Sequence, residues 1–126
     1  MKITFNKRDP VYVQVVHHFK EQIASGLYEP GQEIPSRREL AGQLKINPNT
    51  AQRAYKEMEE ADLIFTEGNN PSRITRDEQV LRAVRTELIE DAVDSFITAV
   101  NPINIPIDEL VDMIKAKYEK QKGGQQ

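Results

Sequence analysis

The sequence contains no cysteine, so disulfides, iron–sulfur clusters and thiol chemistry are excluded. It also has no run that approaches the roughly 18 apolar residues of a membrane-spanning helix. The first ten residues, MKITFNKRDP, lack the apolar segment of a secretory signal peptide. We therefore expect a cytoplasmic protein without a membrane partner.

Catalytic and nucleotide-binding motifs are missing as well. There is no G-x-S-x-G, no P-loop and no G-x-G-x-x-G. The two histidines, His17 and His18, are adjacent, so on a helix they diverge by about 100° and cannot bind one metal ion as an i, i+4 pair would. Surface or hydrogen-bonded histidines are the simpler interpretation. The sequence predicts neither an enzyme nor a metal or cofactor site.

Acidic residues outnumber basic ones, and the excess is unevenly distributed. The 126 residues fit one ordinary domain or a small domain with an appendage, and their net charge of −3 by itself argues against a nucleic-acid partner. Residues 1–76, however, hold 11 Lys and Arg against 10 Asp and Glu, a balance of +1, whereas residues 77–126 hold 6 against 10, a balance of −4. A polyanion would therefore bind the N-terminal part, through a local patch.

Apolar spacing divides the N-terminal part into short elements. Residues 11–24 repeat apolar side chains at helical spacing, and Gly26 suits the left-handed cap that ends a helix. A second helix begins after Ser36, because SRRE at 36–39 has the form of a capping box. Residues 63–75, LIFTEGNNPSRIT, predict two short strands around a Gly-Asn-Asn-Pro loop.

Between these elements, the stretch INPNTAQRAY at 46–55 predicts a third helix with a defined start. Asn47 is a good N-cap, and Pro48 fits the first helical position, where its missing N–H costs nothing. From there the helix separates into two faces. The apolar face contains Ala51, Ala54, Tyr55 and Met58, and the polar face contains Asn49, Gln52, Arg53 and Lys56.

A short helix, a tight turn, a second helix and a strand–loop–strand form a winged helix-turn-helix pattern. Asn and Gln side chains can pair bidentately with adenine, and Arg with guanine, in the major groove of DNA. A polar stripe on a surface helix is more often only a solvated face, so the stripe alone does not decide the function. The four elements in the expected order favour DNA reading, with the strand pair as the wing.

Residues 77–126 follow a different pattern. Apolar residues from Glu78 to Val100 recur as in one long amphipathic helix, Pro106 can open a last helix, and residues 120–126, KQKGGQQ, predict a frayed polar tail. The small winged domain cannot cover so broad an apolar face, so we expect a two-fold partner to bury the rest. The alternative is that both helices complete a monomeric core. The residues expected at the dimer interface are Leu81, Val84, Leu88, Ala92, Phe96, Leu110 and Ile114.

Residues 10–64 also resemble a known family. The initial Pro-x-Tyr, SGLYEPG at 25–31, IPSRRELA at 34–41 and NPNTAQRAY at 47–55 are similar to the winged helix-turn-helix domain of GntR-type bacterial transcription regulators. Asn-Pro-Asn-Thr followed by Arg-Ala-Tyr resembles the YtrA-like subfamily, whose C-terminal part is short and two-helical. The resemblance implies a homodimer that binds a pseudo-palindromic operator, usually as a repressor.

The resemblance also implies which residues meet the DNA. Those carried over by position are Ser36 and Arg38 at the DNA backbone or groove, and Asn47, Asn49, Thr50 and Arg53 in the contact region of the recognition helix. Arg37 is a further candidate for a phosphate contact, because it is a basic group beside a helix N-terminus.

Two positions depart from the family pattern. Lys45 replaces a common glycine between the two helices, and a non-glycine residue in a left-handed conformation costs roughly 1 kcal/mol or more. We therefore expect a reshaped turn there. GNNPSRIT at 68–75 replaces the Gly-x-Gly-Thr-Phe-Val wing, so among wing residues Arg73 is the candidate to reach a minor groove.

The expected protein is mainly α-helical with a small β-wing. Residues 1–76 form a winged helix-turn-helix DNA-binding domain, and residues 77–126 form a two-helix dimerisation or effector region. We expect a sequence-specific transcription regulator, a repressor, whose partner is double-stranded DNA. A winged-helix module that binds another protein is the alternative, and a steep salt dependence would distinguish DNA binding from it. The sequence does not indicate a small-molecule effector.

Overall fold

The computed structural model describes residues 1–124, which fall into two compact units. Unit 1 runs from Met1 to Ile89, and unit 2 begins at Glu90. The elements are α1 (Val11–Ala24), α2 (Arg37–Leu44), α3 (Pro48–Glu60), β1 (Ile64–Phe65), β2 (Arg73–Ile74), α4 (Glu78–Val100), the 3-10 helix η1 (Asn101–Ile103) and α5 (Ile107–Gly124). The predicted mainly helical fold with a small antiparallel wing is confirmed.

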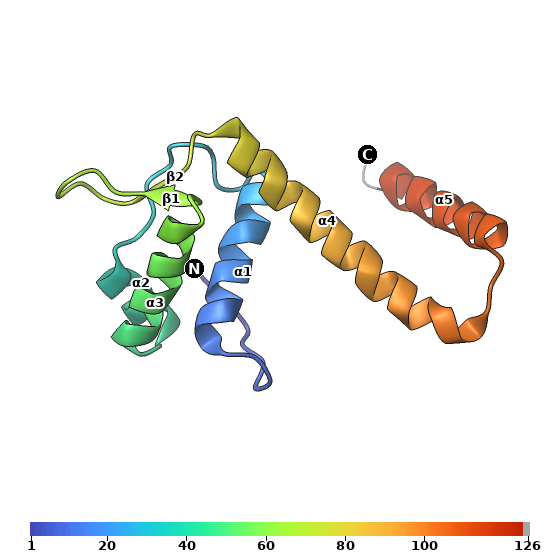
Figure 1. Cartoon of the computed structure of the whole chain (residues 1–126), viewed down its shortest axis with the longest axis horizontal. Coiled ribbons are helices and arrows are strands. Elements are labelled where there is room, and N and C mark those ends of the chain that lie inside the picture. The colour runs from blue at the N-terminus through green and yellow to red at the C-terminus, as the bar shows by residue number, and fades with distance from the viewer. Residues whose placement is uncertain (125–126) are drawn as a thin grey trace. The chain divides into compact units, whose positions relative to one another are not determined.

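The core of unit 1 forms around α3. This helix packs against both α1 and α2, as Figure 1 shows, and its apolar face is buried as expected from the sequence. Tyr55 of α3 is fully buried and meets Phe19 of α1 edge-on, with ring centroids 6.1 Å apart. Its hydroxyl donates to the carbonyl oxygen of Pro35, just before α2. One buried ring therefore links α1, α3 and the start of α2.

Both predicted helix starts are present. Ser36 and Glu39 form a reciprocal capping box: the Glu39 amide donates to Ser36 Oγ at 3.1 Å, and the Ser36 amide donates to Glu39 Oε1 at 3.2 Å. At α3 the Asn49 amide donates to Asn47 Oδ1 at 2.8 Å, and Pro48 is the first helical residue. The caps satisfy N–H groups that a helix leaves unpaired at its start.

The turn between α2 and α3 contains a residue in the left-handed conformation that is not a glycine. Lys45 caps α2 with φ 55° and ψ 46°, and its side chain is exposed. The expectation of a reshaped turn is therefore wrong. The backbone keeps the left-handed conformation, and the Ile46 amide donates to the Ala41 carbonyl oxygen at 3.0 Å.

Replacing Lys45 with glycine is expected to raise the free energy of unfolding by about 0.5–1 kcal/mol. Glycine removes the steric cost of a Cβ in the left-handed region, and this gain exceeds the extra flexibility it adds to the unfolded chain. Urea denaturation at constant m-value measures the change. Lys45→Ala is the matched control, since it removes the same charge and keeps the Cβ. A gain of equal size in both variants would contradict the backbone explanation.

The wing is short and is joined to the segment before α2. Ile64 pairs with Ile74 and Phe65 with Arg73 in the two-stranded antiparallel sheet. Glu33 forms an isolated antiparallel bridge with Arg73, so a third segment borders β2. The loop at 66–71 between the strands is exposed.

The first turns of α4 belong to unit 1. Val84 is only 4% exposed, and Val80, Leu81 and Leu88 pack against the same core while remaining half-buried. The compact unit therefore extends to Ile89, beyond the boundary expected after residue 76. Val84, which was expected at the dimer interface, is instead buried in the core of its own chain.

Unit 2 consists of the remainder of α4, η1 and α5. Helix α5 continues to Gly124, so the predicted frayed tail is wrong for residues 120–124, while residues 125 and 126 lie outside the described part. Many large apolar side chains are exposed in this region. They are Ile89 at the end of unit 1, and Val93, Phe96, Ile97, Ile103, Ile107, Met113, Ile114 and Tyr118 in unit 2.

Candidate nucleic-acid interface

The polar face of α3 is open to solvent. Asn49, Gln52, Arg53 and Lys56 are exposed, while Thr50 in the first turn is half-buried. Their side chains lie opposite the buried apolar face because the two sets differ in helical phase. The predicted division of this helix into a buried and an exposed face is confirmed. An exposed helix with amide and guanidinium groups in this spacing can enter a major groove and read base edges.

Arg53 is held in place by the first turn of α1. Its guanidinium carbon lies 3.9 Å from the centroid of the Tyr12 ring, and Nη2 donates to the Tyr12 hydroxyl at 3.0 Å. A guanidinium has five N–H donors, so most of them remain free for a base or phosphate. The sequence singles out Tyr12 only as the last residue of the Pro-x-Tyr pattern. Its spacing carries no signal for this contact, which joins residues 41 positions apart.

The three candidate residues at the start of α2 have different environments. Ser36 is the exposed N-cap, and Arg38 is exposed in the first turn, with no acidic partner within ion-pair distance among the described residues. Arg37 is half-buried, pairs with Glu59 of α3, and lies 5.2 Å from the centroid of the Tyr55 ring. The structure thus uses Arg37 to join α2 to α3, which leaves Arg38 as the free cation of this turn.

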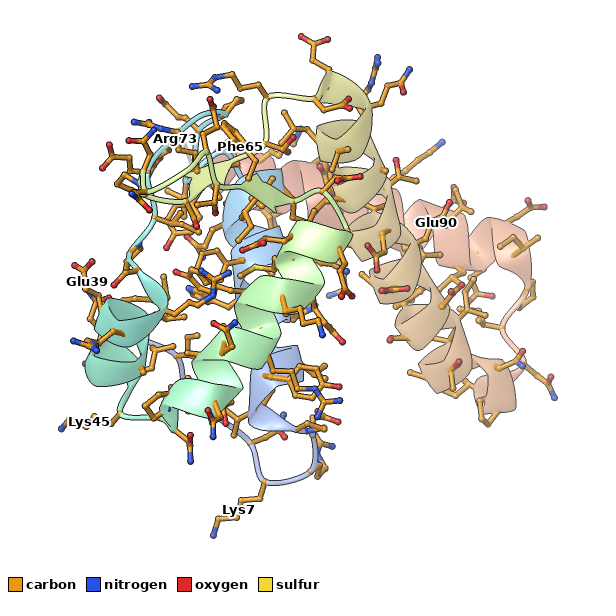
Figure 2. The ribbon with its side chains drawn as sticks, turned by 60° about the vertical axis from the view of Figure 1, so that its left-hand side comes forward. Lys7, Glu39, Lys45, Phe65, Arg73 and Glu90 are labelled. Atoms are coloured by element: carbon orange, nitrogen blue, oxygen red, sulfur yellow. The ribbon has the colours of Figure 1, made fainter. Side chains whose placement is uncertain are left out.

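A shallow open groove joins the start of α2 to the loop of the wing. Ser36, Arg38, Asn69 and Asn70 are among the residues that line it. Arg73 is engaged elsewhere: its guanidinium donates to the Gly31 carbonyl oxygen and to Glu33 Oε1, both at 2.8 Å. Figure 2 shows Arg73 beside Phe65 at the strand pair. A contact between Arg73 and DNA would require its guanidinium to give up these partners.

Burial keeps the central tyrosine protonated. Desolvation raises the pKa of the Tyr55 phenol well above its usual value, although the nearby Arg37 guanidinium opposes the shift. The phenol therefore remains a hydrogen-bond donor to Pro35 at any pH at which the protein is handled. This bond fixes the approach of the chain to α2, and so the position of Ser36.

The two histidines have separate surroundings on α1. His17 Nε2 lies 2.8 Å from Glu21 Oε1 at the surface, while burial lowers the pKa of the half-buried His18 imidazole. Within residues 1–124 there is no group of three or more His, Asp and Glu side chains that could hold a metal ion. No helix in that range is both long and apolar enough to span a membrane.

Comparisons with known proteins match this architecture. The family model for "Bacterial regulatory proteins, gntR family" matches residues 11–74, which run from α1 to the end of β2. The chain is 27% identical over 115 residues to the HTH-type transcriptional regulator YhcF of Bacillus subtilis, covering 91% of this chain and 95% of YhcF. It is 30% identical over 116 residues to the HTH-type transcriptional repressor YtrA of the same organism, covering 91% of this chain and 89% of YtrA.

A solved structure extends the likeness to both units. The GntR family transcriptional regulator from Listeria monocytogenes superposes with a TM-score of 0.81 at 31% sequence identity. The match covers 89% of this chain and 98% of that chain. The similarity therefore includes the helices that follow the wing as well as the winged domain.

Proposed function

Because the chain belongs to the GntR family of bacterial transcription regulators, we propose that it is a cytoplasmic repressor that binds a pseudo-palindromic operator as a homodimer. The observation that carries this proposal is the exposed polar face of α3, on a helix whose start is capped by Asn47 and whose Arg53 is held by Tyr12. A fixed arginine with free donors is suited to bidentate pairing with guanine.

Base reading is assigned to the residues of α3. Asn49, Gln52 and Arg53 carry the groups that discriminate bases, while Lys56 is suited to a phosphate. Thr50 and the N-cap Asn47 lie in the same first turn, where the helix presents its positive end. Ser36 and Arg38 supply backbone contacts from the start of α2. Arg37 and Arg73 are left out of this set because both already bind carboxylates within the chain.

Exposed apolar surface supports the homodimer. Ile89, Val93, Phe96 and Val100 recur at intervals of three or four along α4, and the first three have 40–51% of their surface exposed. Contiguous apolar surface of this kind marks an interaction site. A two-fold partner presents the same stripe, so one surface can bury itself against its copy. Of the expected interface residues, Ala92, Phe96 and Ile114 are exposed, while Leu81, Leu88 and Leu110 are half-buried.

Repression is proposed from the name of one relative. YtrA of Bacillus subtilis, similar over most of its length, is named as a repressor. A small dimer that occupies promoter DNA can act by excluding another protein from the site. This mode of action needs no additional activating surface.

Selection of bound duplexes from random-sequence DNA tests the proposal. We expect the recovered sequences to share a two-fold symmetric motif whose half-site centres lie about one helical turn, roughly 34 Å, apart. Searching the genome for that motif would then identify the regulated promoter. Recovery of unrelated sequences with no common motif, at low salt and at physiological salt, would contradict specific DNA reading.

A further inference from the structure

A basic loop lies immediately before α1, outside the interface described so far. Residues 6–9, Asn-Lys-Arg-Asp, form this N-terminal loop. Lys7 and Arg8 are exposed, and among the described residues neither has a carboxylate within ion-pair distance. The loop therefore presents two free cationic side chains in sequence.

Hydrogen bonds hold the N-terminal loop against α1. Asn6 Oδ1 accepts from the backbone amides of Arg8 and Asp9, each at 3.0 Å. The Gln14 side chain donates to the carbonyl oxygens of Asn6 at 3.1 Å and Asp9 at 2.8 Å, and accepts from the Asn6 amide at 2.9 Å. The loop is thus already ordered, so binding through it costs less conformational entropy than binding through a free terminus.

The N-terminal loop lies next to the start of the proposed reading helix. Pro10 and Tyr12 line an open cleft together with Asn49 and Arg53, so the start of α1 borders the start of α3. Figure 1 shows the loop before α1 and the turn between α2 and α3 at the same end of unit 1. Figure 2 shows Lys7 and Lys45 projecting from that end. The loop therefore extends the exposed surface that begins at Arg53.

A helix in the major groove has a phosphate strand on each side. The groove is about 12 Å wide, close to the diameter of a helix with its side chains. Helix α3 packs against α2 on one side and against α1 on the other. The start of α2, with Ser36 and Arg38, can meet one strand. The N-terminal loop is placed to meet the other.

Charge is also unevenly distributed along the sequence of unit 1. Residues 1–56 hold 9 Lys and Arg against 5 Asp and Glu, a balance of +4, whereas residues 57–76 hold 2 against 5, a balance of −3. The one acid of the loop, Asp9, accepts a hydrogen bond from Asn6 Nδ2 at 3.2 Å. The basic part of the sequence thus includes the loop and the start of α3, and the acidic part begins after Lys56.

We infer that Lys7 and Arg8 bind the phosphate backbone of the operator on the side of α3 opposite to α2. This inference rests on the proposed function, since it adds a contact to the same DNA. These contacts carry no base information, because phosphates are the same at every base pair. They increase the affinity for DNA, and they fix the orientation of α3 within the major groove.

The test is the salt dependence of DNA binding by the variant Lys7→Gln/Arg8→Gln. The probes are the tightest duplex from the random-sequence selection and an unrelated duplex of equal length. We expect weaker binding to both by a similar factor, and a slope of log K against log salt that is smaller by about 1 for each lost side chain per protomer. Lys117→Gln/Lys120→Gln in α5 is the charge-matched control and should leave the slope unchanged.

A second variant separates the order of the loop from its charge. Asn6→Ala keeps both cations and removes the side chain that holds them, so we expect an intermediate loss of affinity. An unchanged slope in Lys7→Gln/Arg8→Gln would overturn the inference, provided that the wild type still selects its operator. Wild-type affinity in Asn6→Ala would overturn the role of the hydrogen-bonded loop. Failure of the wild type to prefer any duplex would instead overturn the proposed function.

Discussion

Replacing Arg53 with alanine is expected to abolish specific operator binding while leaving the protein folded and the proposed homodimer intact. A bidentate Arg–guanine pair contributes about 1–3 kcal/mol of discrimination, and it would form once in each of the two half-sites. The affinity for the operator should therefore fall by about 30-fold or more. The side chain is exposed, and it contacts the ring and the hydroxyl of Tyr12. Its loss should therefore change stability little. Fluorescence anisotropy with the selected duplex measures the change.

Two further variants separate the role of Arg53 in base reading from a general loss of positive charge. Arg82→Ala in α4 removes an equal, exposed charge away from α3 and should leave operator affinity unchanged. Tyr12→Leu keeps Arg53 and removes both of the contacts that orient it. We expect reduced preference for the operator with non-specific affinity retained. Wild-type operator affinity in Arg53→Ala would contradict the assignment of Arg53 as a reader.

Replacing Phe96 with glutamate is expected to convert the proposed homodimer into a monomer. Burial of a phenylalanine contributes about 2 kcal/mol, and two-fold symmetry doubles the loss to about 4 kcal/mol. The dimer dissociation constant should therefore rise by about 1000-fold, before the cost of a buried charge is added. Operator affinity should fall as well, because the two half-sites are then bound by separate molecules. Sedimentation velocity at micromolar concentration measures the change.

Thr98→Glu is the matched control for the dimer. It adds the same charge to the same helix, and its helical phase places it opposite to the stripe of Val93 and Phe96. We expect it to remain dimeric. A Phe96→Glu protein that sediments as the wild-type dimer would show that this stripe is not the interface.

Local signals predicted the elements that position the site. The capping box at Ser36 and the Asn47–Pro48 start depend on residues within three positions of one another, so the sequence alone reveals them. The same holds for the two faces of α3, which follow from helical spacing. The wing was predicted from its apolar pairs and turn residues, and its register matches an antiparallel hairpin.

Contacts between distant residues were not predicted. Arg37 and Arg73 appeared as free cations in the sequence, but Glu59 lies 22 positions from Arg37 and Glu33 lies 40 positions from Arg73. Tyr12 beside Arg53 is the same kind of contact. Val84 matched the apolar stripe of one long helix, and spacing cannot tell which turns of that helix pack on their own chain. Such pairings depend on tertiary packing.

A hydroxyl-radical footprint of the wild-type protein on the selected duplex tests the central claim most directly. If two copies of α3 read one operator, we expect two protected half-sites related by two-fold symmetry, with centres about 10 base pairs apart, at a stoichiometry of two chains per duplex. Protection of a single half-site by one chain, or uniform protection along the duplex, would contradict the account.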